Sequence, residues 1–536
     1  MGARMKAVVR SWRIGVVAAL VATTPATAPA GAQPGAQAAR ESSAPVVRIR
    51  DGAVRGVVAP SGVRVFRGIP FAAPPVGALR WREPQPVARW GGVRAADRFA
   101  AQCMQRRVFD DMVFRNSGVS EDCLYLNVWQ PAAATSSTRR PVLVYFYGGG
   151  FQAGDGSEPR YDGESMARRG IVVVTLSYRL GVFGFLAHPE LTAESPNKAS
   201  GNYGLMDQWA ALRWVRASIA AFGGDPAQVT IAGESAGSFS VSAQMVSPRS
   251  RGLFARAIGE SGAFLTGMPL ADAERAGAVY AKSLGVSSLA ELRALSAMEL
   301  LASGARPGSQ GFWPIVDGWF ITESPRETLA AGRQAKVALL AGWNSEESSW
   351  RGLTRTAPTT DSARSILARV FGPRADEAAR VYPIGSDAEA MQSLTDLAGD
   401  QFIGYGTWKW LDEHARSGAP TYRYFYAHPR PAPTASSNGG ALPTGAVHSA
   451  EIEYAMGNLA LNRVFAWTAD DEKVSATLMG YFANFIATGD PNGAGLPAWP
   501  KGALDADGKA WRMRIDVASK GEAEPRGRYL LLDGVK

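Results

Sequence analysis

Ser235 has the surroundings that most clearly point to chemistry. It is the centre of Gly233-Glu234-Ser235-Ala236-Gly237, which follows the apolar run 229–232 and precedes a segment with a helical pattern. A serine between a strand and a helix is typical of a nucleophile elbow, whose tight turn needs glycine two residues before and after the serine. In a chain with 59 glycines, chance would supply about half of one such match, so the interpretation depends on other residues.

Three glycines, 148–150, end the apolar stretch 141–147, which is typical of a buried parallel strand. Glycines at the end of such a strand let backbone N–H groups turn toward an oxyanion. Together with the amide of Ala236, Gly149 and Gly150 would make a three-donor oxyanion hole. A flexible loop would explain one or two glycines, but not three that are followed by Phe151 and lie upstream of the serine in this order.

A serine nucleophile needs a general base and an orienting carboxylate, which follow it in the order serine, acid, histidine. The chain contains four histidines. His188 precedes the serine and is interpreted as structural, and His414 lies among charged residues of a helical pattern, typical of a solvated face. His428 ends the apolar run 422–427, whereas His448 lies on a loop after that run and before a helix start. Order and loop position favour His448, with His428 as the alternative.

The carboxylate is expected just after another buried strand, 337–342. Glu346 and Glu347 follow the end of this strand. Catalytic carboxylates of open parallel sheets lie outside the carboxyl ends of the strands, so both residues are placed for the role. Spacing alone does not separate them.

Further motifs extend over roughly residues 46 to 500. They are FRGIPFA at 66–72, PPVGALRW at 74–81, SEDCLYLNV at 120–128, GNYGLMDQ at 201–208 and FGGDP at 222–226. In these motifs the chain resembles the type-B carboxylesterases, the cholinesterase and carboxylesterase branch of the α/β-hydrolases, as a bacterial exported member. So many motifs in one order make chance negligible. The resemblance implies a large, mostly parallel central sheet flanked by helices, with an active-site gorge at the carboxyl ends of the strands.

The resemblance also resolves the alternatives that spacing left open. In the family the acid is the second acidic residue of an Asn-x-Asp-Glu-Gly pattern, which implies Glu347, with Glu346 and Ser348 as departures. The family histidine lies in a His-x-x-Glu-Ile/Leu pattern, which residues 448–452 match and the alternative histidine does not. Another departure is Tyr147, where the family commonly has histidine. Because the oxyanion donors are backbone amides, we expect Tyr147 to alter only what supports the loop. The implied triad is Ser235, Glu347 and His448.

Composition agrees with one large α/β domain. A chain of 536 residues, 46% of them hydrophobic, can bury a large core, and we predict a single domain over 46–536. The mild net charge of +9 is spread along the chain and gives no reason to expect a nucleic-acid partner. The sequence has no His/Cys cluster, no H-E-x-x-H and no dinucleotide fingerprint, so no metal or cofactor is expected.

The first residues have the pattern of a secretory signal peptide. A basic region is followed by the short apolar stretch 14–22 and by an A-x-A cleavage motif at 30–32. This stretch is too short to span a bilayer, and no cysteine follows it closely, so no stable membrane anchor is expected. We predict a signal peptide at 1–32, a flexible segment at 33–45, and export to the periplasm or medium.

The only cysteines, Cys103 and Cys123, are close in sequence, and an exported chain most simply pairs them. The family also has a disulfide at this place. In cholinesterases the loop that it closes carries a tryptophan whose face holds a quaternary ammonium group. Here residues 104–122 contain no tryptophan, so a choline ester is not expected. Arg106, Arg107 and Arg115 in this loop would favour an anionic ester if they faced the site, although a solvated loop face is the more ordinary interpretation.

Three aromatic residues are candidates for lining the substrate site. Trp350 resembles an aromatic position on the alcohol side of the family gorge, and Phe151 and Phe312 are candidates for the acyl side. Phe151 and Phe312 could equally be ordinary core residues.

The expected partner is a small-molecule ester, cleaved by a serine hydrolase. One alternative is an esterase specialised for a single bulky or polycarboxylate ester, such as a toxin-degrading enzyme. Another is a non-catalytic binding module, since some members of this fold have lost the nucleophile. The survival of the serine, the acid, the histidine and the glycine loop together favours the enzyme. The sequence does not indicate the oligomeric state.

Overall fold

A computed structural model describes residues 44–304, 306, 308, 312–434, 444–505 and 507–535. The chain divides into two compact units, Met1–Ala44 and Pro45–Lys536, of which the second is considered below. The predicted signal peptide, 1–32, lies outside the described residues, as does the predicted flexible segment apart from its last two residues.

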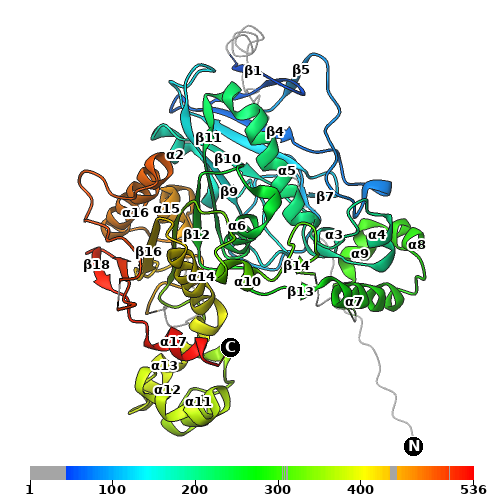
Figure 1. The fold of residues 1–536 in the computed structure, drawn as a ribbon. Helices are drawn as coiled ribbons and strands as arrows, with labels where there is room; N and C mark the ends of the chain where they lie inside the picture. Colours follow the sequence, from blue (N-terminus) through cyan, green and yellow to red (C-terminus); the bar gives the residue numbers. More distant parts are fainter. Residues whose placement is uncertain are drawn as a thin grey trace, which may run out of the picture. The chain divides into compact units, whose positions relative to one another are not determined.

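A mixed 11-stranded sheet forms the centre of the unit Pro45–Lys536 (Figure 1). Its strand order is β18-β17-β16-β15-β12-β11-β9-β10-β8-β4-β3. The strands are β3 (Val57–Val58), β4 (Arg64–Pro70), β8 (Tyr125–Gln130), β9 (Arg140–Phe146), β10 (Val172–Leu176), β11 (Gly224–Glu234), β12 (Arg256–Glu260), β15 (Ala338–Asn344), β16 (Thr421–Tyr426), β17 (Trp511–Ile515) and β18 (Lys520–Ala523). Neighbours from β10 to β17 are parallel, and antiparallel strands lie at both edges. The predicted mostly parallel sheet is confirmed.

Helices cover both faces of this sheet. They are α2 (Glu164–Arg168), α3 (Gly181–Phe185), α4 (Pro189–Glu194), α5 (Tyr203–Ser218), α6 (Ala236–Val246), α7 (Leu270–Ser283), α8 (Leu289–Ala294), α9 (Ala297–Ala302), α10 (Pro325–Ala330), α11 (Thr360–Phe371), α12 (Ala375–Val381), α13 (Asp387–Gly399), α14 (Tyr405–Arg416), α15 (Ile452–Met456), α16 (Ala469–Thr488) and α17 (Gly527–Asp533). Two-sided burial explains why the central strands are continuous apolar runs: every residue of β10 is buried.

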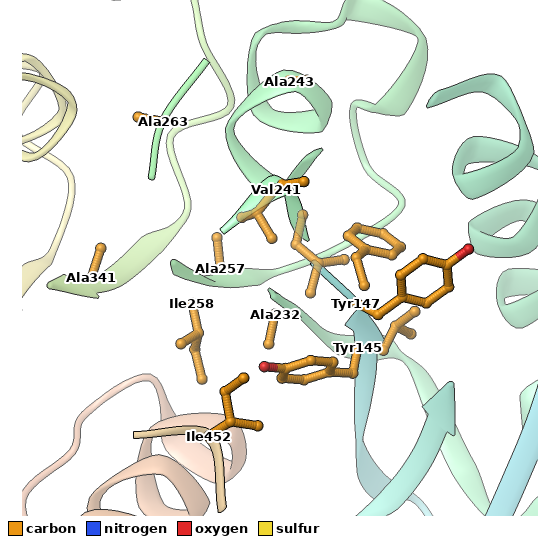
Figure 2. Close-up of a cluster of buried hydrophobic side chains, with 14 of the residues drawn as sticks. Tyr145, Tyr147, Ala232, Val241, Ala243, Ala257, Ile258, Ala263, Ala341 and Ile452 are labelled. Carbon is orange, nitrogen blue, oxygen red and sulfur yellow. The ribbon is translucent and has the colours of Figure 1, made fainter. Parts of the chain in front are cut away.

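Figure 2 shows buried hydrophobic side chains packed on both sides of the central strands. Val241 of α6 lies on one side of the strands and Ile452 of α15 on the other. Ala257 and Ile258, neighbours on β12, point to opposite sides because successive strand residues alternate. The strands that lead to the site are therefore packed against side chains on both faces.

Short strands complete the fold. They are β1 (Val46–Ile49), β2 (Gly52–Arg55), β5 (Val93–Ala95), β6 (Gln102–Cys103), β7 (Val119–Ser120), β13 (Met268–Pro269) and β14 (Ile315–Val316). Cys103 and Cys123 form the predicted disulfide, and β6 pairs with β7 next to it, so both contacts hold the ends of the loop 104–122 together. Within the described ranges, no helix is both long and apolar enough to cross a bilayer.

Candidate active site

Ser235 occupies a sharp turn between β11 and α6. Its backbone has φ 54° and ψ −121°, a conformation that non-glycine residues rarely adopt. A Cβ atom on Gly237 would lie 2.1 Å from the carbonyl oxygen of Phe146, and one on Gly233 would lie 2.6 Å from the same atom. Close approach of β9 to the turn therefore excludes side chains at both glycine positions, and the serine side chain projects from the turn.

The predicted residues Ser235, His448 and Glu347 lie together. His448 Nε2 is 2.9 Å from Ser235 Oγ, and His448 Nδ1 is 2.6 Å from Glu347 Oε2. Both distances are those of hydrogen bonds. With Nδ1 protonated and donating to the carboxylate, Nε2 is free to accept the hydroxyl proton of Ser235. The arrangement can therefore activate a serine hydroxyl.

The loops of the acid and the histidine are joined to each other. Glu346 N donates to Ala446 O over 2.8 Å, and Asn344 Nδ2 donates to Val447 O over 2.8 Å. Glu347 Oε1 accepts hydrogen bonds from Ser261 Oγ at 2.5 Å and from Asn344 N at 2.6 Å. With one oxygen engaged in this way, the other oxygen of Glu347 is left to face the imidazole.

Glu346 points elsewhere. Its carboxylate accepts a hydrogen bond from the hydroxyl of Thr444 on the histidine loop, in an exposed position. The structure thus distinguishes the two acids that spacing could not separate, because consecutive residues leave this loop in different directions. Of these two acids, only Glu347 contacts His448.

Three further buried acids, which were not predicted as site residues, interact with the histidine or with one another. Glu234 Oε1 is 3.2 Å from His448 Nε2, Glu451 Oε2 accepts from Asn344 Nδ2 at 2.5 Å, and Glu260 accepts from Tyr145 Oη at 3.1 Å. Burial raises the pKa of Glu234 to about 8 and that of Glu451 to about 7. Sequence signals existed for two of them, since Glu234 lies within the serine motif and Glu451 within the histidine motif.

Glu234, Glu347 and Glu451 favour the charged form of His448. Burial disfavours the imidazolium, but the neighbouring carboxylates of Glu234 and Glu347 outweigh it, and the pKa of His448 is raised. A raised pKa makes the ring a stronger base toward a serine proton. Closely spaced buried carboxylates cannot all ionise at neutral pH, so the cluster as a whole retains protons.

The glycine loop provides backbone donors. Gly149 has φ 112° and Gly150 has φ 63°, and a Cβ atom on Gly149 would lie 2.2 Å from Ala153 O. Among the described residues, none accepts a hydrogen bond from the amide N–H of Gly149, Gly150 or Ala236. Ala236 is the first residue of α6, where helix N–H groups have no partner within the helix. All three amides are free to bind an anion.

Tyr147 supports this loop through Tyr178. The two rings stack with centroids 4.3 Å apart. Tyr147 Oη donates to Tyr178 O at 3.0 Å, and Tyr178 Oη donates to Tyr147 O at 2.7 Å. The reciprocal pair fixes the backbone just before the glycines, which explains how tyrosine can stand at this position.

The other histidines have structural contacts. His188 Nδ1 accepts from Glu190 N and caps α4. The expected solvated face is wrong for His414, which is fully buried between α14 and the chain before β15 and lies 2.8 Å from Val337 O. Burial lowers its pKa to about 4. His428, the alternative base, lies 2.9 Å from Asp471 and not at Ser235.

Trp313 is the aromatic side chain that borders the serine turn and the glycine loop, and it was not predicted. Its ring centroid is 5.3 Å from that of Phe151 and 6.1 Å from that of Phe239, whose amide bonds to Ser235 O. Phe151 is completely buried, whereas Trp313 is 41% exposed, so Trp313 presents the accessible surface. Phe312 packs on Tyr280 at 5.0 Å.

Phe402 is a second unpredicted neighbour of the site. It lies in a π-helical turn, η8 (Asp400–Gly404), and its ring is edge-on to His448 with centroids 5.2 Å apart. A π-helical turn has no sequence signal, which explains the omission. Trp350 lies against Arg351, whose guanidinium carbon is 4.3 Å from the ring centroid. Within the described ranges, no group of three or more His, Cys, Asp or Glu could hold a metal ion.

Comparisons with known proteins give a consistent result. A model of the carboxylesterase family matches residues 43–524. The chain is 37% identical to the fumonisin B1 esterase of Sphingopyxis macrogoltabida, over 87% of this chain and 86% of that protein. It is 36% identical to carboxylesterase 5A of Canis lupus familiaris, over 89% and 88%. The crystal structure of carboxylesterase EST55 from Geobacillus stearothermophilus superposes with a TM-score of 0.76 at 32% identity, covering 90% of this chain and 99% of that one.

Proposed function

This chain belongs to the carboxylesterase family and is a carboxylic ester hydrolase, and we propose that it works through an acyl-enzyme on Ser235. The observation that carries the proposal is the continuous hydrogen-bonded chain from Ser235 Oγ through both nitrogens of His448 to Glu347. Glu347 would hold the imidazole in the required tautomer and stabilise its charged form.

In the first half-reaction, Ser235 Oγ attacks the ester carbonyl carbon while His448 Nε2 takes the hydroxyl proton. The carbonyl oxygen becomes an anion and receives hydrogen bonds from the amides of Gly149, Gly150 and Ala236. The bond to the alcohol oxygen then breaks, and His448 returns the proton to that oxygen. An alcohol leaves and the acyl group remains on the serine.

In the second half-reaction, a water molecule takes the place of the alcohol. His448 accepts its proton as the water oxygen attacks the acyl carbon, and then returns this proton to Ser235 Oγ. The carboxylic acid leaves and the enzyme is regenerated. No cofactor enters either step.

A fluorophosphonate probe tests the assignment of the nucleophile. We expect a peptide with one covalent adduct on Ser235 by mass spectrometry, with activity lost in proportion to labelling. Ser235→Ala should take up no probe and lose ester hydrolysis by orders of magnitude at an unchanged unfolding midpoint. Turnover near that of the wild type in this variant would overturn the proposal. The non-catalytic binding module would remain an alternative only if the wild type and the variant were both inactive.

A second candidate is an esterase specialised for one bulky or polycarboxylate ester, of the toxin-degrading type. Its support is the relative named fumonisin B1 esterase. Fumonisin B1 should then disappear on incubation with the wild type and persist with Ser235→Ala, as followed by mass spectrometry. A broad preference for simple monoesters, with fumonisin B1 left intact, would favour the generalist.

We also propose export, with a mature chain that begins near Gln33. The disulfide between Cys103 and Cys123 is compatible with an oxidising compartment. Amino-terminal sequencing of protein recovered from the periplasm or medium of a bacterial host tests the cleavage site. Recovery of the uncleaved chain would contradict it.

A further inference from the structure

A cavity of about 260 Å³ lies beside the oxyanion loop, at Gln152 and Trp313. Its walls are mostly apolar, with Leu300 and Leu301 of α9 and with Phe312. Residues of the loop closed by the disulfide, including Arg106, and residues 180–183 supply the other walls. Of the described residues that line the cavity, Arg106 is the only charged one.

The structure separates the three arginines of this loop. Arg115 donates to Asp162 at 2.8 Å and to Ser157 O at 2.7 Å, and its guanidinium lies over Phe99, so it is structural. Arg107 lies 3.7 Å from Asp110 on the exposed surface. Arg106 forms neither an ion pair nor a hydrogen bond with any residue in the described part of the chain. The guanidinium of this loop that has no partner among the described residues is therefore the one that lines the cavity.

The position of the histidine indicates which part of an ester faces this cavity. His448 must give a proton to the leaving oxygen, so the alcohol part lies beside His448 and Phe402. The acyl part then lies toward the other aromatic side chain at the nucleophile, Trp313. Trp313 also lines the cavity, which continues from it toward Arg106.

We propose that this cavity is an acyl subsite for esters whose acyl chain ends in a carboxylate, and that Arg106 is the residue that selects the charge. The inference rests on the proposed function of Ser235. A guanidinium pairs with a carboxylate through two parallel hydrogen bonds, and the apolar walls suit the methylene groups between the two carbonyl carbons. Among the described residues no acid pairs with this guanidinium, so a substrate carboxylate would not have to displace one.

The test compares two esters of similar length that share one leaving group, mono-4-nitrophenyl glutarate and 4-nitrophenyl pentanoate. The variants are Arg106→Gln, Arg106→Lys and Arg107→Gln, the last being a matched control that removes a charge from the neighbouring position. Specificity constants are measured at two salt concentrations, because steering of an anion by net charge weakens with salt whereas a paired contact persists more. Free glutarate is also tested as a competitive inhibitor.

We expect Arg106→Gln to lower kcat/KM for the glutarate ester about tenfold, while pentanoate hydrolysis stays near that of the wild type. The inhibition constant of glutarate should rise by a similar factor. Arg106→Lys should retain part of the preference, and Arg107→Gln should change neither ester by more than about twofold.

Three outcomes would overturn the inference in distinguishable ways. If the wild type cleaves pentanoate and Arg106→Gln leaves the ratio of the two esters unchanged, the subsite is wrong and the proposed function stands. If the wild type cleaves neither ester and takes up no fluorophosphonate, the proposed function fails and the inference fails with it. Equal losses in Arg106→Gln and Arg107→Gln would show general steering and also contradict the subsite.

Discussion

Glu347 Oε2 lies 2.6 Å from His448 Nδ1, whereas the carboxylate of the preceding residue bonds to Thr444. We therefore expect Glu347→Gln to lower kcat by at least about a hundredfold, because the amide cannot hold the tautomer or offset the imidazolium charge. Glu346→Gln, the matched control one residue away, should stay within about threefold of the wild type. Steady-state kinetics on a 4-nitrophenyl ester measures both, and comparable losses or the reverse order would contradict the assignment.

Glu234 lies 3.2 Å from His448 Nε2, and its carboxylate helps to raise the pKa of the ring. The ring must be neutral to accept a proton, so activity rises with pH as the imidazolium deprotonates. Glu234→Gln removes one of the groups that stabilise the imidazolium. The pKa of the ring falls, and the acid limb of kcat/KM against pH should move to lower pH by about one unit.

The control for this profile is Glu346→Gln, an exposed acid whose loss should leave the limb in place. A limb that moves to higher pH in Glu234→Gln, or does not move, would show that Glu234 does not act on the histidine through charge.

The disulfide should contribute to the stability of the fold. Cys103 and Cys123 are separated by 20 positions, and replacing both with serine should lower the free energy of unfolding by about 3 kcal/mol. Denaturant unfolding of the oxidised wild type and the double variant gives this difference. Two alkylatable thiols in native protein from the periplasm would contradict the pairing.

Choline esters should be poor substrates. The loop 104–122 has no tryptophan to bind a quaternary ammonium group. The ring of Trp350 is already in contact with the guanidinium of Arg351. A contact of this kind is worth about 2 kcal/mol or more when dry, so its absence leaves the desolvation of the cation uncompensated. Acetylcholine should be hydrolysed no better than its uncharged isostere, 3,3-dimethylbutyl acetate, at two salt concentrations. A clear preference for the cation at both would refute this and make Trp350 the first residue to replace.

Much of the serine turn could be predicted from the sequence because its causes are local. The backbone of the turn approaches β9 so closely that only glycine fits at Gly233 and Gly237, and this steric demand appears directly as a motif. The glycine loop and the apolar strands are local in the same way. The disulfide was predictable because the chain has only two cysteines.

Other features depend on segments far apart in the chain. The charged neighbours of His414 indicated a solvated face, yet its own side chain turns inward against the chain before β15. Trp313 and Phe402 come to the site from the residues just before β14 and from a π-helical turn, neither of which has a periodic signal.

The sequence by itself determined the candidate nucleophile, the fold class and the order of the candidate site residues, since steric needs and apolar periodicity act between near neighbours. Only the tertiary structure decided which arginine of the loop 104–122 is paired and which lines a cavity. The physical reason is that the role of a charged side chain depends on which group it pairs with. The partner of Arg115 is Asp162, 47 positions away, and no local sequence pattern indicates that the fold brings these two residues together.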